Sequence, residues 1–321
     1  MDTQSGSLRL EGVQGRGRSS LLQKAALGAW LLITLASMVS LVLSIYSLNL
    51  WDRIPAVDAP RYFSGMTPEG IQQHADWQAE VMKAGLSLAG YAAIFTVARS
   101  LAGLALLGVS LLLALRYRDR PLALALAALL SLFAATGLWA NALYDWGVAI
   151  APWMKIPAQI LGWLTRCSAI VIFIFPDGKF NPRWTRWLAV LLVPLGFLMA
   201  FQIDIFLNPT NWPPPFYLFP DVVFIGGALL ALLVRFSRAD LQLRRALLGY
   251  TLGLVLLIGL HFLYLFLTQV YDLVAGHELF ETAPAFLRFV LRSEPIWFAA
   301  VVLFAAGVAI SVFREKLLDR Q

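Results

Sequence analysis

The sequence predicts an all-α protein, a polytopic transmembrane helical bundle of about eight spans with its N- and C-termini in the cytoplasm. Apolar residues make up 60% of the 321 residues and charged residues only 14%, and the mean hydropathy is +0.73. These values argue against a soluble core. Long apolar runs recur along the chain, and the loops between them carry Lys and Arg mostly on alternate sides.

The apolar runs are long enough to cross a bilayer. A hydrocarbon layer of about 30 Å needs roughly 20 helical residues, because lipid offers no partners to exposed backbone groups. The first run follows a polar, arginine-bearing stretch and is about twice as long as the apolar part of a signal peptide, so we interpret it as a retained anchor. We expect spans at 27–50, 87–115, 121–144, 156–175, 187–206, 220–236, 246–270 and 295–313.

The basic residues predict the orientation, since Lys and Arg are retained on the cytoplasmic side. With the N-terminus inside, seventeen Lys and Arg residues fall in inside segments and six in outside segments. We therefore expect both termini in the cytoplasm. The same asymmetry accounts for the net charge of +6, so we predict no nucleic-acid partner.

Three regions follow from this topology. We expect a cytoplasmic N-terminal tail at 1–26, an eight-span membrane domain at 27–313 and a cytoplasmic C-terminal tail at 314–321. The last outside loop carries aromatic and basic residues at 285–292, a pattern that suits a short separate helix in the headgroup zone.

The longest outside loop, 51–86, contains a predicted short amphipathic helix. Thr67 supplies a hydroxyl cap and Pro68 suits the first turn, while Gly85 suits the end. Glu80 is expected to stay in water on the polar face. We interpret this helix as a surface cap on the bundle, and a dedicated ligand-binding loop is the alternative.

The inside loop at 175–184 (FPDGKFNPRW) has the strongest local signal. In its Pro-Asp-Gly segment, proline fixes the backbone angle, aspartate can accept from the amides that follow it, and glycine accepts a left-handed exit. The pattern predicts a tight return between two helices. The residues that carry it are Pro176, Asp177, Gly178, Lys179, Pro182, Arg183 and Trp184.

With this loop, four further stretches make the chain resemble the membrane-embedded N-terminal sensor region of multi-span bacterial histidine kinases and related regulators, particularly those of Chloroflexota. The stretches are similar to segments that enter or leave the spans of that family. Together they cover most of residues 80–321, and they are 84–91 (AGLSLAGY), 118–124 (RDRPLAL), 241–249 (LQLRRALLG) and 313–319 (FREKLLD).

The resemblance implies a sensor-like membrane module in a bacterial plasma membrane, without its kinase part. In that family the last span leads into cytoplasmic catalytic domains, whereas the sequence here has eight residues after Phe313. It contains no phosphoacceptor histidine on a soluble helix and no glycine-rich nucleotide site, so kinase activity does not carry over.

Ionisable side chains within the spans indicate a candidate polar site, because a charge near the bilayer centre costs about 2.5–3.5 kcal/mol and needs a partner or a purpose. The set could form an outward-facing pocket for a small anionic or amphipathic ligand. The alternative is that the arginines only hold helices together, paired with an aspartate or with backbone carbonyls. The candidates are Arg99, Asn141, Asp145, Arg166, Gln202, Asp204 and His261.

Neither a metal site nor a catalytic site is predicted. A single cysteine, Cys167, excludes an intramolecular disulfide and a thiolate cluster. The three histidines, His74, His261 and His277, lack the paired spacing of a metal site, although His261 alone could ligate a tetrapyrrole. Ser, His and Asp are spread over different sides and depths, so we expect no enzyme and no cofactor.

Three functional classes remain. We favour a non-catalytic signal-transducing sensor module that works with a separate cytoplasmic regulator. The alternative is an accessory or scaffolding subunit of a larger electron-transfer or photosynthetic membrane complex. A small-molecule transporter is less favoured, since the chain shows no internal repeat or matched pair of broken spans.

Overall fold

The computed structural model describes residues 5–58, 68–136, 153, 155–213, 216–267, 283–314 and 317–320, and every regular element in these ranges is a helix. Each of the eight predicted spans coincides with a described helix over at least part of its length. The α-helices are α1 (Ser5–Arg53), α3 (Pro68–Lys83), α4 (Leu88–Arg116), α5 (Pro121–Thr136), α7 (Lys155–Ser168), α8 (Ile170–Ile174), α9 (Thr185–Ala200), α10 (Phe219–Arg238), α11 (Leu241–Leu265) and α13 (Ala283–Ala309).

Five helical segments in the described part of the chain are long and apolar enough to cross a membrane, as expected of a multi-pass membrane protein. They are Gln23–Leu43, Leu88–Arg116, Lys155–Ile174, Leu241–Leu265 and Ser293–Arg314. The helices α5 and α9 are apolar but have 16 residues each, so they rise about 24 Å, less than the hydrocarbon thickness of about 30 Å.

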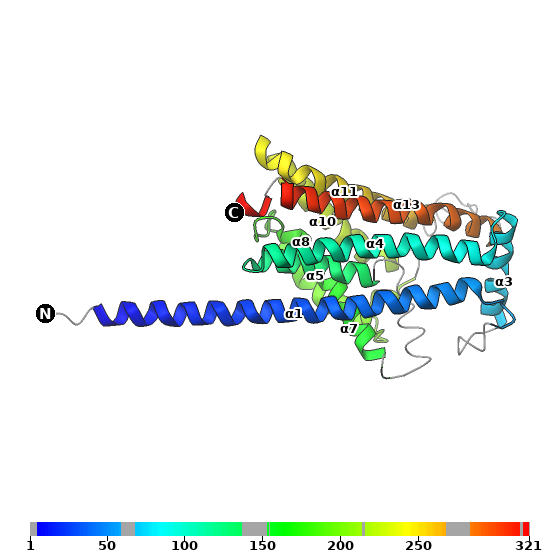
Figure 1. Cartoon of the computed structure of the whole chain (residues 1–321), viewed down its shortest axis with the longest axis horizontal. Coiled ribbons are helices and arrows are strands. Elements are labelled where there is room, and N and C mark those ends of the chain that lie inside the picture. Colours follow the sequence, from blue (N-terminus) through cyan, green and yellow to red (C-terminus); the bar gives the residue numbers. More distant parts are fainter. Residues whose placement is uncertain are drawn as a thin grey trace.

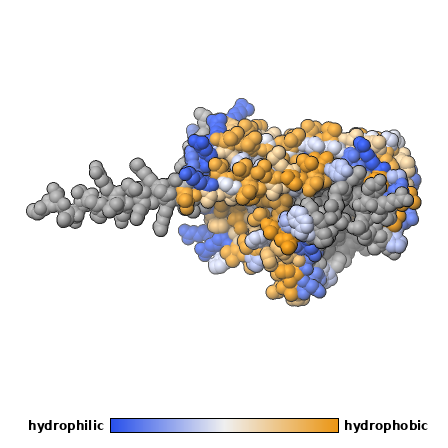
Figure 2. Space-filling model, turned by 60° about the horizontal axis from the view of Figure 1, so that its bottom comes forward, coloured by the Kyte–Doolittle hydropathy of each residue, from blue (hydrophilic) through white to orange (hydrophobic). Residues whose placement is uncertain are grey.

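The helices run roughly side by side, and the two ends of the bundle differ (Figure 1). The start of α1 and the last short helix, Leu317–Arg320, lie at one end, which we call the termini end. The helix α3 lies across the opposite end, which we call the α3 end. On the face drawn in Figure 2, hydrophilic residues gather toward both ends and broad apolar surface lies between them.

The helix α1 is longer than the span expected at 27–50, and one other expectation is wrong. The segment of α1 that is apolar enough to cross a membrane is Gln23–Leu43, and the helix extends back to Ser5, because no proline occurs before Pro55 and the apolar helix can continue into the polar segment before it. The short surface helix expected at 285–292 is not separate, since it is the first part of α13, which continues through Pro295.

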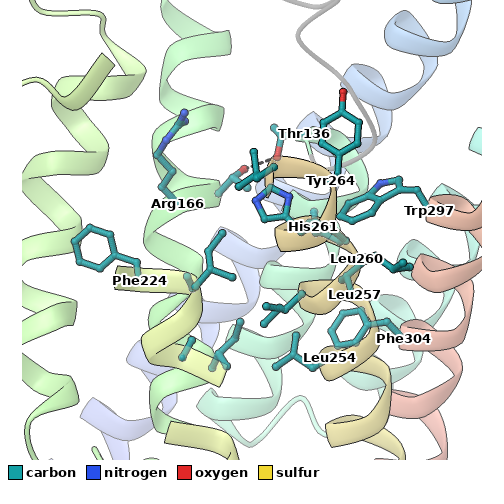
Figure 3. A pocket seen from close by; sticks show the side chains of 18 of the residues that line it. Thr136, Arg166, Phe224, Leu254, Leu257, Leu260, His261, Tyr264, Trp297 and Phe304 are labelled. Carbon is teal, nitrogen blue, oxygen red and sulfur yellow. Dashed lines mark hydrogen bonds between the residues drawn. The ribbon is translucent and has the colours of Figure 1, made fainter. Parts of the chain in front are cut away.

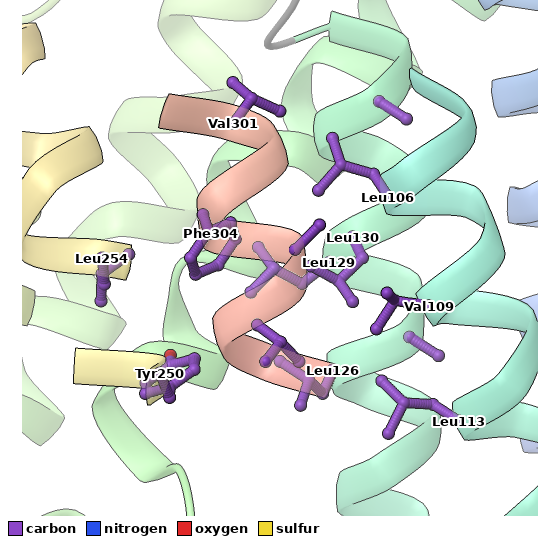
Figure 4. Packing of buried hydrophobic residues seen from close by; sticks show 14 of the residues in the cluster. Leu106, Val109, Leu113, Leu126, Leu129, Leu130, Tyr250, Leu254, Val301 and Phe304 are labelled. Carbon is purple, nitrogen blue, oxygen red and sulfur yellow. The ribbon is translucent and has the colours of Figure 1, made fainter. Parts of the chain in front are cut away.

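The core lies between α4, α5, α11 and α13 (Figure 4). Leu106 and Leu113 of α4, Leu130 of α5 and Val301 of α13 are fully buried. Lipid is as apolar as these side chains, so close packing rather than the hydrophobic effect must hold the helices together.

Glycines allow α11 and α13 to approach closely. A Cβ atom added at Gly307 would lie 2.2 Å from the carbonyl oxygen of Gly249, and one at Gly253 would lie 2.8 Å from the Cα of Phe304. Ser311 adds a hydrogen bond by accepting from the amide of Tyr250 at 2.9 Å. The termini half of this helix pair is therefore tightly joined.

A buried hydroxyl network joins α1, α4 and α5. Ser110 accepts from the indole Nε1 of Trp30 at 3.2 Å and donates to the carbonyl of Ala127 at 2.7 Å. Its Oγ also lies 2.8 Å from that of Ser131, which is 3.0 Å from Thr34 Oγ1. The network gives these three apolar helices a specific register.

The helix α3 closes one end of the bundle and packs against α4 and α13. It ends as predicted beside Gly85, which has a φ of +80°, but the expectation that Glu80 stays in water is wrong. Glu80 is 1% exposed and binds Lys83 at 2.7 Å, because this face of α3 turns toward the bundle.

His74 and Gln78 of α3 hold the chain that follows α1. Gln78 donates Nε2 to the carbonyl of Ile54 at 2.6 Å and accepts from the amide of Ala56 at 3.2 Å. His74 Nε2 lies 3.1 Å from the same carbonyl oxygen. Both side chains are buried, and together they fix α3 on the end of α1.

Candidate functional site

The α3 half of the bundle contains a cavity of about 690 Å³ (Figure 3). Its lining comes from α5, α7, α8, α9, α10, α11 and α13. Most of the lining is aliphatic or aromatic, with a small number of polar groups. This volume and composition are typical of a pocket for a small organic molecule.

The polar groups gather at one end of the cavity. On α5, Thr136 lies nearer the α3 end than Leu129, and on α11 His261 lies nearer that end than Leu254. In Figure 3, Thr136, Arg166, His261, Tyr264 and Trp297 accordingly lie above Leu254, Leu257 and Phe304. The cavity thus has a polar end toward α3 and an apolar floor toward the middle of the bundle.

Arg166 borders the polar end from α7. Its guanidinium donates to the carbonyl of Gly162 on the same helix at 3.2 Å, and its stem covers Gly196 of α9, where an added Cβ would lie 3.3 Å from the Arg166 Cβ. The arginine thus packs α7 on α9 and also lines the cavity. The predicted binding and helix-packing roles do not exclude each other here.

His261 lies in an aromatic group at the polar end. Its ring centroid is 6.1 Å from that of Trp297 on α13 and 5.9 Å from that of Phe262. Tyr264 stacks on Phe289 of α13, with the ring centroids 6.1 Å apart. The helices α11 and α13 are in close contact at the termini end. At the polar end of the cavity, aromatic rings lie between them.

Arg99 does not line the cavity, but its partner does. Its guanidinium lies 3.8 Å from the carboxylate of Glu294 on α13, which also accepts from the hydroxyl of Tyr91 at 3.3 Å. The rings of Phe95 and Phe298 flank the cation at 5.6 and 6.0 Å. Glu294, which borders the cavity, therefore links it to α4.

The other predicted pocket residues do not join this group in the described structure. Gln202 has a φ of 50° and is exposed, and Asp204 is also exposed and accepts from Asn211 at 3.1 Å. Both belong to the turn after α9, beyond the lining of the cavity. Asn141 and Asp145 lie outside the described residues.

The loop at 175–184 forms the predicted tight return at the termini end. Asp177 accepts from the amide of Lys179 at 3.2 Å, and Gly178 has a φ of +71°. The sequence did not indicate the role of Arg235, a buried residue of α10 that donates to the carbonyls of Phe173, Phe175 and Lys179. Pro176 is buried and Pro182 half-buried, whereas Arg183 and Trp184 are exposed.

The comparisons with known proteins leave the family open. No protein-family model, curated protein or solved structure matches this chain. The resemblance to kinase sensor regions therefore stays a prediction, and the site has to be interpreted from its own chemistry.

In the described ranges the lining of the cavity combines a few polar groups with a larger apolar surface. Within these ranges no group of three His, Cys, Asp or Glu residues is placed to hold a metal ion. The sequence did not identify Glu294 or Trp297 as residues of the site. The only signal for Glu294 was that a carboxylate stands one residue before the expected span at 295–313. The arrangement can accommodate a molecule with one polar end and one apolar end.

Proposed function

We propose that this protein is a non-catalytic membrane sensor module that binds a small amphipathic molecule in the cavity and signals to a separate cytoplasmic protein. The observation that carries the proposal is the cavity itself, because seven helices contribute to its lining. A molecule that contacts so many helices binds some of their arrangements better than others, and it therefore shifts the bundle toward those arrangements.

The proposal includes eight crossings of a bacterial plasma membrane with both termini in the cytoplasm. Two observations support it. The start of α1 and the end of the described chain lie at the same end of the bundle. The loop at 175–184 belongs to that end as well, and so do Arg116, the last residue of α4, and Arg118 and Arg120, which follow it. The excess of basic residues therefore lies there.

A single helix can carry the signal. Along α13, Glu294 and Trp297 border the cavity, and the helix continues through Ile310–Arg314 toward Leu317–Arg320 at the termini end. There Arg120 donates to the carbonyl of Leu318. Pro295 lies between the two cavity residues and lacks an amide hydrogen, so one backbone hydrogen bond of α13 is missing at the cavity.

Spin-label distances across the termini end test the coupling. In a Cys167→Ser background, labels at Ser237 and Arg314, both exposed, report the separation of α10 and the end of α13. Oleate and decylubiquinone serve as probes in lipid nanodiscs. We expect either probe that binds to shift the distance distribution, and we expect the shift to disappear in Leu257→Trp protein, whose larger side chain would occupy part of the apolar floor where the tail lies.

An unchanged distance distribution with a probe bound in the cavity would contradict the sensor proposal. Purification from native membranes tests the alternative. A fixed stoichiometric complex with other membrane subunits, together with unchanged spin-label distances, would instead identify an accessory subunit.

A further inference from the structure

We infer that the ligand is an amphipathic lipid-like molecule whose head carries a hydrogen-bond-accepting oxygen, such as a carboxylate or a ring carbonyl. The head would lie beside Trp297 and the apolar tail would extend toward Phe304. This inference rests on the proposed function and adds the chemical class and the orientation of the ligand.

Trp297 indicates the chemistry of the head. Its side chain lines the cavity, and its indole Nε1 is buried without a hydrogen-bond partner among the described residues. An indole N–H can only donate, and a buried donor without a partner is costly. Figure 3 shows the indole projecting from α13 toward His261, so an accepting oxygen at this end of the cavity would satisfy it.

The neighbouring groups also favour an acceptor over a cation. The guanidinium of Arg166 can only donate, and it borders the same end of the cavity. The nearby carboxylate of Glu294 is already engaged by Arg99 and Tyr91. An ammonium head would face the donors of Arg166 and Trp297 and would compete with Arg99 for its counter-ion.

The lining of the cavity floor indicates that the ligand has an apolar tail. Leu129, Leu254, Leu257 and Phe304 line it with hydrocarbon, and a polar group placed there would lose its hydrogen bonds to water without replacement. The cavity volume of about 690 Å³ lies within the range of sites for molecules of this size. A head toward α3 and a tail toward the middle of the bundle therefore match the polarity of the lining.

Photolabelling in nanodiscs tests the inference on the full chain. A diazirine-bearing fatty acid is crosslinked to the protein and the labelled residues are mapped by mass spectrometry. Four competitors separate the head chemistries: oleate, decylubiquinone, oleylamine and hexadecane. We expect the label on residues that line the cavity, displacement by oleate or decylubiquinone, and at least about 10-fold weaker displacement by oleylamine and hexadecane.

A variant isolates the indole donor. Trp297→Phe keeps an aromatic ring but removes the N–H, and we expect about 3- to 10-fold weaker competition by the preferred acceptor, the range that one hydrogen bond contributes. Trp187→Phe is the matched control, because Trp187 is 60% exposed on α9 and lies outside the cavity lining. It should leave the competition unchanged.

The outcomes separate this inference from the proposed function. Equal displacement by oleylamine, or Trp297→Phe protein that binds like wild type, overturns the acceptor-head inference while cavity binding stands. The selectivity of the wild-type protein decides the matter if Trp297→Phe does not fold. If no cavity residue is labelled and Leu257→Trp changes nothing, both the inference and the proposed function fall.

Discussion

The buried ion pair between Arg99 and Glu294 should dominate the local stability of the α4–α13 contact. The two side chains are 5% and 10% exposed and their charges lie 3.8 Å apart. At an effective dielectric constant of about 20 this separation corresponds to about 4 kcal/mol of attraction. Removing one partner of a buried pair typically costs about 3–5 kcal/mol, because it leaves the other charge uncompensated.

A double-mutant cycle measures this coupling. We expect Arg99→Met and Glu294→Gln each to lower the free energy of unfolding by about 3 kcal/mol, and the double variant to lose clearly less than the sum of the two. Unfolding is followed by circular dichroism during SDS titration of the detergent-solubilised protein. Arg118→Met is the matched control, since Arg118 is 71% exposed and should change stability by no more than about 0.5 kcal/mol.

The reasoning is refuted if the effects of Arg99→Met and Glu294→Gln simply add. Additivity would mean that the two charges contribute independently, for example by contacting other groups. In that case Arg99 would not join Glu294 to α4, and the hydroxyl of Tyr91 would remain as the contact between α4 and Glu294.

Three further predictions concern the fold. Gly307→Leu should separate α11 from α13 and lower the free energy of unfolding by more than about 2 kcal/mol in the same SDS titration, because even a Cβ there would lie 2.2 Å from the carbonyl oxygen of Gly249. The control Gly108→Ala, which has open space around it, should leave the stability unchanged. A stable Gly307→Leu protein would disprove the close approach of the two helices. Ser110→Ala should lower the free energy of unfolding by about 1–3 kcal/mol, because it leaves the Trp30 indole without its acceptor. The control Ser237→Ala, at the exposed end of α10, should leave the stability unchanged. Equal losses in the two variants would argue against the hydroxyl network. Burial lowers the pKa of His74 from its ordinary value of 6.5, although the Ile54 carbonyl partly opposes the shift. The neutral ring therefore contributes its full stabilisation to the folded state above pH 6.5. This stabilisation declines as the pH falls from 6.5 toward the lowered pKa. Thermal unfolding between pH 7.5 and 5 should show a decline that is smaller in His74→Gln protein, and identical pH profiles would exclude His74 as its source.

Local patterns in the sequence predicted much of the fold. Apolar runs located the helices, Gly85 marked the end of α3, and the Pro-Asp-Gly segment predicted the return at 175–184 with the observed bond from Lys179 to Asp177. These features depend on residues within a few positions of one another. For this reason composition and spacing were sufficient to find them.

Helix boundaries were predicted less well, because apolar periodicity does not say where a helix must stop. The segment 285–292 is an example, because it was expected to form a short helix of its own and is instead the first part of α13. The prediction that Glu80 is exposed to water was wrong for another reason. Which face of α3 turns toward the bundle depends on how α3 packs on α4 and α13.

By itself, the sequence determined that this is an apolar, all-helical chain with ionisable side chains inside its helices, since hydropathy and charge are properties of consecutive residues. Only the tertiary structure decided which of those side chains meet. It paired Arg99 with Glu294, almost two hundred positions away, and it brought Arg166, His261 and Trp297 to one end of a common cavity. Such contacts depend on the packing and rotation of separate helices, and the order of residues within one helix does not encode them.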